Sequence, residues 1–280
     1  MTDTVLVTGT SSGIGLATAI AAARAGWRTV ATMRDPSRSS ALLEAAESAG
    51  VSDLIEVRAL DVTDAAAAAA CVADVVAAHG RLDAVINNAG AGHLGTLEQE
   101  SVDDVRQVFE VNFFGVLNVT KPALPHLRAA GGRLIAVTSV GGVVGQPFNE
   151  AYCGAKFAVE GYFESLAPLA AAHGVRVTVV EPGAVASEFV ANVGFDPAQL
   201  AAAGPYAPQL RTYLDRTGAA FAAAQTSEAA AASIIDVLTA DKPAFRVQTS
   251  DIARTFVGSK LADLDGSAVQ SMTATWVTDN

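Results

Sequence analysis

Short runs of β-branched and aliphatic residues alternate with longer helical segments over the first two thirds of the chain. These runs occupy residues 4–8, 28–33, 54–60, 83–87, 133–139 and 176–181. Buried strands that alternate with helices are typical of a parallel sheet with helices on both faces. The alternation therefore predicts an α/β fold of the doubly wound Rossmann type, with about seven strands, in a single domain over residues 1–280.

Capping residues and glycines mark where the first helices begin and end. Asp35 is expected to be the N-cap of a helix whose first residue is Pro36, and Thr63 is expected to cap the next one. Glycine ends a helix readily because it accepts the left-handed conformation. The expected helix ends are Gly26, Gly50 and Gly80.

Composition excludes several classes of partner. The chain carries 18 Lys and Arg against 29 Asp and Glu, a formal charge of −11, so nucleic acid and anionic membranes are not expected partners. The sequence shows no secretory signal and no apolar run long enough to span a membrane, which predicts a cytoplasmic protein. Cys71 and Cys153 are too few for a disulfide framework, and neither they nor the four histidines have metal-site spacing, so no metal is expected.

A glycine-rich turn follows the first expected strand in "VLVTGTSSGIGLATA". Gly9, Gly13 and Gly15 let the backbone approach a pyrophosphate, whose charge the N-terminus of the next helix stabilises. The spacing G-x-x-x-G-x-G differs from the usual dinucleotide fingerprint, and a purely structural turn remains the alternative at this point.

This turn resembles the cofactor loop of the short-chain dehydrogenases/reductases, in their compact branch. Further motifs follow in the order that the family has them, and they extend over most of the chain. They are "DV" at 61–62, "NNAG" at 87–90, Asn112 in "VNFFG", Ser139 in "VTSVGG", "YCGAK" at 152–156 and "PG" at 182–183.

The resemblance implies where a nicotinamide dinucleotide would bind. Asp61 and Val62 would hold the adenine, and "NNAG" would form the floor of the site, although its asparagines could also be ordinary turn formers. Ser187 stands where the family usually has Thr in a segment that orients the nicotinamide. The expected cofactor-binding residues are Gly9, Ser11, Ser12, Gly13, Ile14, Gly15, Arg34, Asp61, Val62, Asn88, Ala89, Gly90, Tyr152, Lys156, Pro182, Gly183, Val185 and Ser187.

The family's catalytic residues also have counterparts here. By resemblance Tyr152 is the general acid/base, Lys156 lies beside it, Ser139 binds the substrate oxygen and Asn112 belongs to a proton relay. Tyr152 and Lys156 are four residues apart, so they share one helical face, which is also true of ordinary surface pairs. One ammonium about 4 Å from a phenol, at an effective dielectric of about 20, supplies about 4 kcal/mol, enough to lower the phenol's pKa from about 10 to about 7.

The residues at the end of the second expected strand indicate which dinucleotide is used. NAD-preferring relatives have an acidic residue there, whereas this chain has Met33 followed by Arg34. A guanidinium suits a 2′-phosphate, and Ser12 and Arg38 could donate further hydrogen bonds. Asp35 would oppose a phosphate, but its expected role as N-cap directs it to the backbone. The sequence thus favours NADP(H) over NAD(H).

The segment 187–224 is expected to cover the substrate site. It is rich in apolar side chains and poor in cations, which favours an apolar ketone or alcohol as substrate. The alternative is that these residues only pack onto the sheet or form a subunit contact. The stretch "ATMRDP" also resembles hydroxysteroid and retinol dehydrogenases. His93, in a loop after "NNAG", is either a substrate contact or a surface residue.

The resemblance therefore predicts an NADP(H)-dependent oxidoreductase that transfers hydride between the nicotinamide and a carbonyl or secondary alcohol. Relatives are commonly homodimers or homotetramers, so an oligomer is expected. The alternative from another class is a non-catalytic dinucleotide sensor or scaffold, because a fold does not fix a function. Such proteins typically lose the Tyr or the Lys, and this chain has both at Tyr152 and Lys156.

Overall fold

A seven-stranded parallel sheet forms the centre of the protein. The computed structural model describes residues 2–186, 200, 203–222 and 224–278, and for 219–222 only the backbone. Every neighbouring pair of strands in the main sheet is parallel, as the sequence predicts. The strands, in spatial order, are β3 (Ile55–Ala59), β2 (Arg28–Met33), β1 (Thr4–Thr8), β4 (Ala84–Asn87), β5 (Arg133–Val137), β6 (Arg176–Glu181) and β9 (Arg246–Gln248).

The strand order reverses direction between β1 and β4. Val5 of β1 pairs with Thr29 on one side and with Ala84 on the other, so the chain winds outward from β1 in both directions. In doubly wound sheets ligands bind beyond the carboxyl ends of the strands at this reversal. The topology thus places the glycine turn after β1 and the "NNAG" segment after β4 at the expected ligand site.

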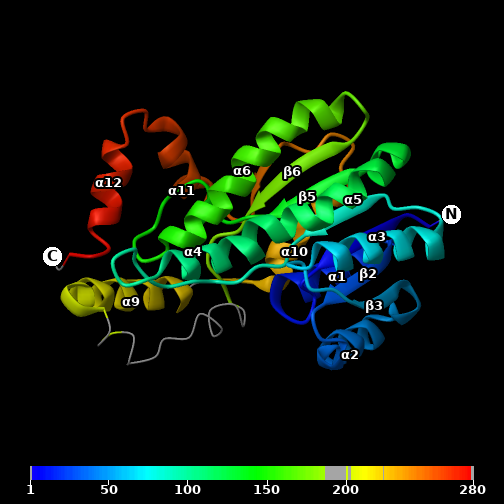
Figure 1. Cartoon of the computed structure of the whole chain (residues 1–280), viewed down its shortest axis with the longest axis horizontal. Coiled ribbons are helices and arrows are strands. Elements are labelled where there is room, and N and C mark those ends of the chain that lie inside the picture. Colours follow the sequence, from blue (N-terminus) through cyan, green and yellow to red (C-terminus); the bar gives the residue numbers. More distant parts are fainter. Residues whose placement is uncertain (1, 187–199, 201–202, 223, 279–280) are drawn as a thin grey trace.

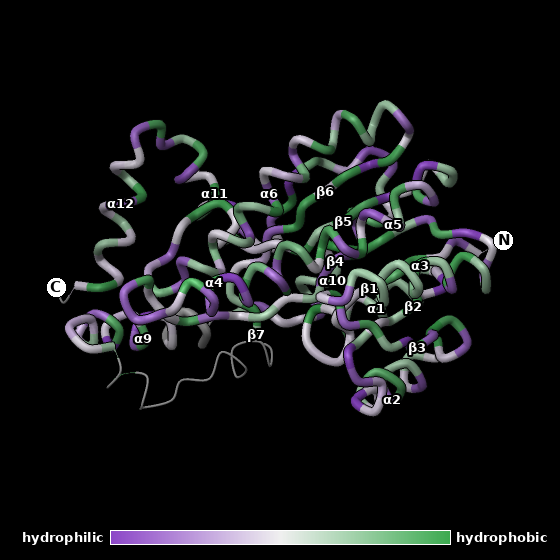
Figure 2. Tube along the Cα trace, viewed as in Figure 1, coloured by the Kyte–Doolittle hydropathy of each residue, from purple (hydrophilic) through white to green (hydrophobic). Residues whose placement is uncertain are grey.

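Helices cover both faces of the sheet (Figure 1). One face packs against α1 (Gly13–Arg24) and α10 (Ser227–Thr239), with α2 (Ser40–Ala49) near the β3 edge. The opposite face packs against α3 (Ala65–His79), α5 (Gly115–Ala130) and α6 (Glu150–Ala171). The hydrophobic colour in Figure 2 follows the central strands, which agrees with the complete burial of β1.

The helix ends follow the sequence prediction with two corrections. Gly50 and Gly80 end α2 and α3 in the left-handed conformation, as expected. Asp35 does accept a hydrogen bond from Ser37 N, but it caps a short 3₁₀ turn before α2 begins at Ser40. Thr63 is not the cap of α3, because its hydroxyl binds the preceding Asp61. The cap is the next residue, Asp64, which accepts from the backbone N–H groups of Ala66 and Ala67.

The C-terminal part of the chain contains strands and helices that the sequence analysis does not predict. A short parallel pair, β7 (Val185–Ala186) and β8 (Gln225–Thr226), forms a separate two-stranded sheet. The helices α9 (Ala207–Ala222), α11 (Asp251–Ala262) and α12 (Ser267–Ala274) lie together at the end of the molecule that holds the C-terminus (Figure 1). Within the described residues, no helix has both the length and the apolar character to cross a membrane.

Candidate active site

A cavity of about 1040 Å³ opens at the carboxyl ends of the strands, where the topology predicts a ligand. Its lining residues come from the end of β2, from the glycine turn, and from α9 and α11. Most of the residues expected to bind cofactor or substrate line it. They are Gly9, Ser11, Ser12, Gly13, Ile14, Gly15, Arg34, Asp61, Val62, Asn88, Ala89, Gly90, Ser139, Tyr152, Lys156, Pro182, Gly183 and Val185.

The glycine turn is packed so closely that only glycine fits at two positions. A Cβ at Gly9, where φ is +72°, would lie 2.8 Å from Cα of Ala89, and one at Gly15 would lie 2.0 Å from Gly9 O. Asn88 supports the turn by donating hydrogen bonds from Nδ2 to Thr8 O and Gly9 O. The turn thus brings backbone close to the cavity without side chains between them.

The N-terminus of α1 faces the same cavity and fits an anionic group. Helix α1 begins at Gly13, and the side chain of its N-cap Ser12 makes no capping hydrogen bond. Because the first N–H groups of a helix have no partners within the helix, they and the helix dipole favour a phosphate. The close approach of Gly9 and Gly15 leaves room for one, so these residues fit a dinucleotide.

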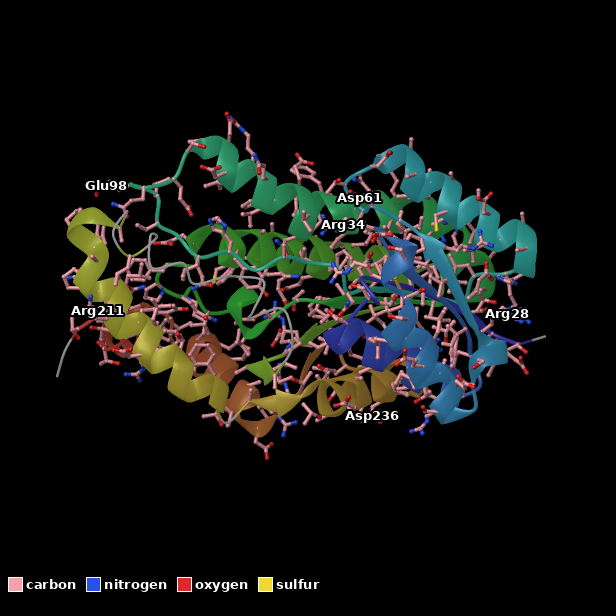
Figure 3. All side chains as sticks on the ribbon, turned by 90° about the horizontal axis from the view of Figure 1, so that it is seen from below. Arg28, Arg34, Asp61, Glu98, Arg211 and Asp236 are labelled. Atoms are coloured by element: carbon pink, nitrogen blue, oxygen red, sulfur yellow. The ribbon has the colours of Figure 1, made fainter. Side chains whose placement is uncertain are left out.

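Two arginines lie at the β2 end of the cavity. Arg34 and Arg38 both line it, together with Met33. Arg34 and Asp61 lie near one another (Figure 3), and hydrogen bonds from Thr63, with a further contribution from the Arg34 charge, lower the pKa of the Asp61 carboxyl. The cavity therefore has permanent positive charge where a ribose 2′-substituent of the adenosine half would lie.

Tyr152 and Ser139 both line the cavity, and their side chains share a hydrogen bond. Tyr152 is in the first turn of α6, and Ser139 follows β5, where its Oγ accepts a 2.9 Å hydrogen bond from Gly141 N. Burial raises the pKa of the Tyr152 phenol, and a hydrogen bond with the Ser139 side chain acts in the opposite direction. The lowered pKa expected from the sequence therefore has to overcome the burial of the phenol.

Lys156 lies one helical turn after Tyr152 and is also buried. Its Nζ is 5.7 Å from the centre of the Tyr152 ring and donates a 3.3 Å hydrogen bond to Val137 O. Burial lowers the pKa of Lys156 to about 8, while the nearby Glu160 raises it. The lysine is thus close enough to act on the phenol, but its own charge depends on the surroundings.

Asn112 lies in a π-helical segment, Glu110–Phe114, between α4 (Val102–Phe109) and α5. Its amide donates to Ala91 O and Val108 O, and its Oδ1 accepts from Ala91 N. A Cβ at Gly90 would lie 2.9 Å from Asn112 Oδ1 and 3.3 Å from Lys156 Nζ. Asn112 therefore lies directly behind Gly90 and fixes the floor of the cavity, which it does not itself line.

The family model described as short chain dehydrogenase matches residues 3–197 of this chain. The protein belongs to the short-chain dehydrogenase family. It is similar to human 17-beta-hydroxysteroid dehydrogenase type 1, with 36% identity over 271 residues that cover 94% of this chain and 82% of the relative. It is also similar to retinol dehydrogenase 8 of Bos taurus, with 34% identity over 279 residues that cover 94% of this chain and 86% of that one.

A solved structure supports the same family and fold. The short-chain dehydrogenase from Streptomyces avermitilis superposes with a TM-score of 0.78 at 30% identity, and the match covers 100% of this chain and 99% of the other. The fold class and the family expected from the sequence are thus confirmed.

At the far end of the cavity in this short-chain dehydrogenase, Tyr213 and Leu214 come from the segment 187–224 that the sequence predicts to cover the substrate site, whereas Asn149, Phe256 and Trp276 were not predicted. Asn149, the N-cap residue of α6, donates a 2.6 Å hydrogen bond from Nδ2 to the hydroxyl of Tyr213 on α9. Tyr213 packs in an apolar cluster with Leu94, Leu214 and Trp276, which also line the cavity. Val185, Ile252 and Phe256 are further apolar residues of the lining. Asn149 could have been predicted as a residue of the site because it lies three residues before Tyr152. Phe256 and Trp276 lie far along the chain from the family's motifs, so the sequence gives no indication that they line the cavity.

The remaining sequence predictions concern Ser187, His93 and metal binding. Ser187 and the rest of residues 187–199, which begin the expected substrate-covering segment 187–224, lie outside the described residues. His93 does not line the cavity, although Gly92 and Leu94 do, because its ring is paired with Glu100. In the described part of the chain, no group of His, Cys, Asp and Glu side chains could hold a metal ion.

Proposed function

We propose that this short-chain dehydrogenase is an NADP(H)-dependent enzyme that interconverts an apolar ketone and its secondary alcohol. The observation that carries the proposal is that three features line one cavity. They are two arginines, the glycine turn with the N-terminus of α1, and the group of Ser139, Tyr152 and Lys156. Catalysis by these three residues, with Asn112 behind them, is part of the proposal.

The side chains have separate roles in ketone reduction. A nicotinamide held at this site would supply the hydride to the carbonyl carbon. Ser139 holds the carbonyl oxygen by a hydrogen bond, and Tyr152 donates its phenolic proton to that oxygen as negative charge develops there. The Lys156 ammonium stabilises the phenolate that Tyr152 becomes. In alcohol oxidation the same proton returns to Tyr152.

The choice of NADP(H) is supported by charge at the β2 end of the cavity. Arg34 and Arg38 line it where the adenosine ribose would lie, and Asp35 is directed to Ser37 N. Solved proteins of similar fold hold NADP, as in ElxO, or NAD, as in the protein from Burkholderia phymatum, each at 22% identity. The argument for NADP(H) therefore comes from the residues of this chain.

The substrate class is supported by the far end of the cavity. Its walls are mainly aliphatic and aromatic side chains from α9, α11 and the segment after α12. Phe256 and Trp276 stack with their ring centres 5.8 Å apart. Such a surface favours the apolar body of a ketone. The 17-beta-hydroxysteroid and retinol dehydrogenases named above are consistent with this class.

Absorbance of NADPH over a panel of carbonyl compounds tests the function. We expect oxidation of NADPH with apolar ketones, and a rise in kcat/KM of about tenfold for each two methylenes that become buried. Faster turnover of small sugars or hydroxy acids would contradict the substrate class. NADPH binding without turnover of any carbonyl or alcohol would instead favour a non-catalytic sensor.

A second copy of the chain is the proposed partner, in a homodimer or homotetramer. Phe114, Phe157 and Tyr162 are exposed, and Phe113 joins them through ring contacts with Phe114 and Tyr162 at 5.1 and 6.0 Å. Neighbouring exposed aromatic side chains favour association. Sedimentation of the wild type and of Tyr162→Arg tests this, with a smaller species expected for the variant. The cytoplasmic location stays a prediction from the sequence.

A further inference from the structure

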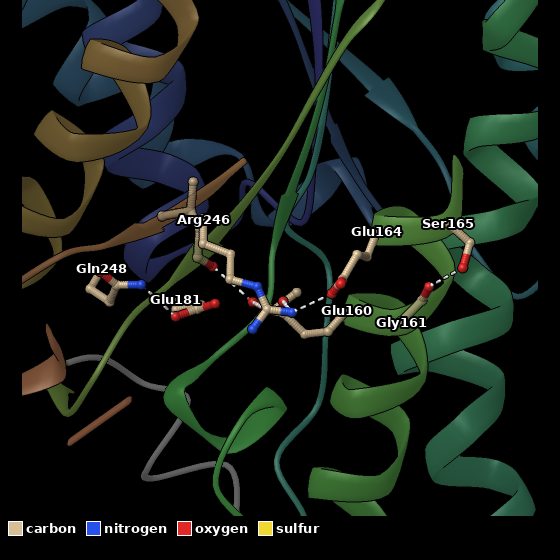
Figure 4. Close-up of polar contacts among 9 residues, drawn as sticks. Glu160, Gly161, Glu164, Ser165, Glu181, Arg246 and Gln248 are labelled. Atoms are coloured by element: carbon tan, nitrogen blue, oxygen red, sulfur yellow. Dashed lines mark hydrogen bonds and ion pairs between the residues drawn. The ribbon is translucent and has the colours of Figure 1, made fainter. Parts of the chain in front are cut away.

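A polar cluster is buried behind the candidate catalytic residues, between α6 and the sheet (Figure 4). It contains Glu160 of α6, Glu181 of β6 and Arg246 of β9, and it extends to Thr138 at the end of β5. The Glu160 side chain is only 4% exposed. Buried carboxyl groups are costly, so their retention calls for a reason beyond packing.

The two glutamates are only partly satisfied. Thr138 donates a 2.5 Å hydrogen bond to Glu160 Oε1, while Arg246 Nη2 is 3.6 Å from Glu160 Oε2 and 2.7 Å from Glu164 Oε2. Glu181 Oε2 accepts from Gln248. Among the described residues, Glu160 Oε2 and Glu181 Oε1 have no hydrogen-bond partner. Glu160 is therefore held in place without being fully neutralised.

Glu160 is linked to both parts of the candidate catalytic group. It lies one helical turn after Lys156 on the same helix, which brings the two side chains onto one face. Its partner Thr138 immediately precedes Ser139 in the chain. The loop after Ser139 also lies close to the Glu160 side chain, because a Cβ added at Gly142 would lie 3.0 Å from Glu160 Cγ.

We propose that Glu160 is a positioning residue: its carboxylate maintains the charged form of Lys156, and its hydrogen bond from Thr138 holds the Ser139 loop against α6. The proposal rests on the proposed function for the roles of Lys156 and Ser139. Glu160 touches neither the cavity nor a substrate and acts only through these two residues.

The electrostatics agree with this geometry. Burial raises the pKa of Glu160 to about 7; the Thr138 hydrogen bond and Arg246 lower it, and Glu181 and Glu164 raise it. Burial lowers the pKa of Lys156 to about 8, and Glu160 raises it. Glu160 is therefore ionised in the pH range where Lys156 would lose its proton. The charged groups facing Glu160 are Lys156 and Glu164 from α6, Glu181 from β6 and Arg246 from β9.

Direct titration of Lys156 in the free protein tests the charge effect without cofactor or substrate. Protein labelled with ¹³C at lysine Cε is titrated by NMR, and Lys156→Met identifies the resonance. We expect Glu160→Gln to lower the pKa of Lys156 by about half to one unit, because a nearby negative charge is removed. Glu164→Gln is the matched control: it contacts the same Arg246 but is 62% exposed, so no shift is expected.

The kinetic readout tests the positioning effect. In alcohol oxidation, the alkaline limb of the plot of kcat against pH should move to lower pH in Glu160→Gln. Glu160→Ala also loses the hydrogen bond from Thr138. This variant should therefore have a still lower kcat, with the KM for NADP unchanged. Glu160→Leu repeats the NMR test if the glutamine variant does not fold. If the pKa of Lys156 in the Gln or Leu variant equals that in the wild type, the proposal is overturned.

If the wild-type protein shows no turnover at all, the proposed function is overturned instead, and the NMR result can still be interpreted.

Discussion

Asn88 donates a 3.0 Å hydrogen bond from Nδ2 to the carbonyl oxygen of Gly9, and so ties the segment after β4 to the turn after β1. The two segments meet at the reversal of strand order, where the cavity opens. A contact between two loops that are far apart in sequence thus sets the shape of the proposed phosphate site.

Gly15→Ala should disrupt this contact. The added Cβ would lie 2.0 Å from Gly9 O and 2.5 Å from Asn88 Nδ2, so the turn has to move. We expect a loss of about 2 kcal/mol or more in the free energy of unfolding, with much weaker NADPH binding. Urea denaturation and fluorescence titration measure the two effects.

Gly161→Ala is the matched control for that substitution. Gly161 lies inside α6, and a Cβ there meets nothing within 4 Å. We expect a gain of about 0.5–1 kcal/mol in stability and unchanged NADPH affinity. Equal effects of the two substitutions on stability and on NADPH affinity would show that the close packing around Gly15 determines neither property.

Tyr152→Phe should abolish most of the turnover and leave cofactor binding nearly intact. The phenol is expected to transfer the proton, while the phosphates would rest on the glycine turn at a distance from it. A general acid is typically worth about 10²–10⁴-fold in rate. Measured kcat and NADPH Kd decide the matter, and a variant that keeps more than about a tenth of the activity removes Tyr152 from the mechanism.

Arg34→Ala should raise the KM for NADPH by about tenfold or more and change the KM for NADH little. A charge-assisted hydrogen bond to a 2′-phosphate is worth about 1.5–3 kcal/mol, and only NADPH carries that phosphate. Arg24→Ala, on the exposed end of α1, controls for the loss of positive charge. Parallel changes in the two KM values would mean that Arg34 does not distinguish the cofactors.

The sequence predicted best those features that depend on local pattern. The strands up to β6 and the Gly50 and Gly80 helix ends follow from burial and backbone conformation alone. The expected cap Thr63 failed because Asp61 engages its hydroxyl, a contact that patterns do not reveal. Strand β9 was not located because it has three residues, two of them polar.

The substrate end of the cavity could be predicted only in part. Tyr213 of α9 lies in the segment 187–224 that was expected to cover the substrate site, whereas Trp276 comes from beyond α12 and reaches the cavity only through tertiary packing. The Asn149 to Tyr213 hydrogen bond spans 64 residues. Nothing in either local sequence indicates the other, so residue roles there depend on the structure.

Tyr213→Phe should discriminate between two kinds of ketone. The Tyr213 hydroxyl accepts from Asn149 and has no acceptor for its own hydrogen among the described residues, so it can donate to a ligand in the cavity. We expect the KM to rise about tenfold for an apolar ketone with a second oxygen at its far end, and to stay unchanged for the ketone without it. Tyr162→Phe, on the exposed face of α6, is the control. Equal changes for both ketones would contradict a hydrogen bond from Tyr213.

Glu160→Gln should make the protein more stable at pH 8 and not at pH 4.5. Burial raises the pKa of Glu160 from its ordinary 4.5 to about 7. Between these values the folded state binds more protons than the unfolded state, so stability falls as pH rises through this window, and the whole penalty is present above about pH 7. The neutral amide avoids it, still accepts from Thr138 and leaves Arg246 paired with Glu164. Urea denaturation at the two pH values should show a gain of at most about 3 kcal/mol at pH 8, and little change for Glu164→Gln. A gain of equal size at both pH values would mean that the effect does not come from the Glu160 charge.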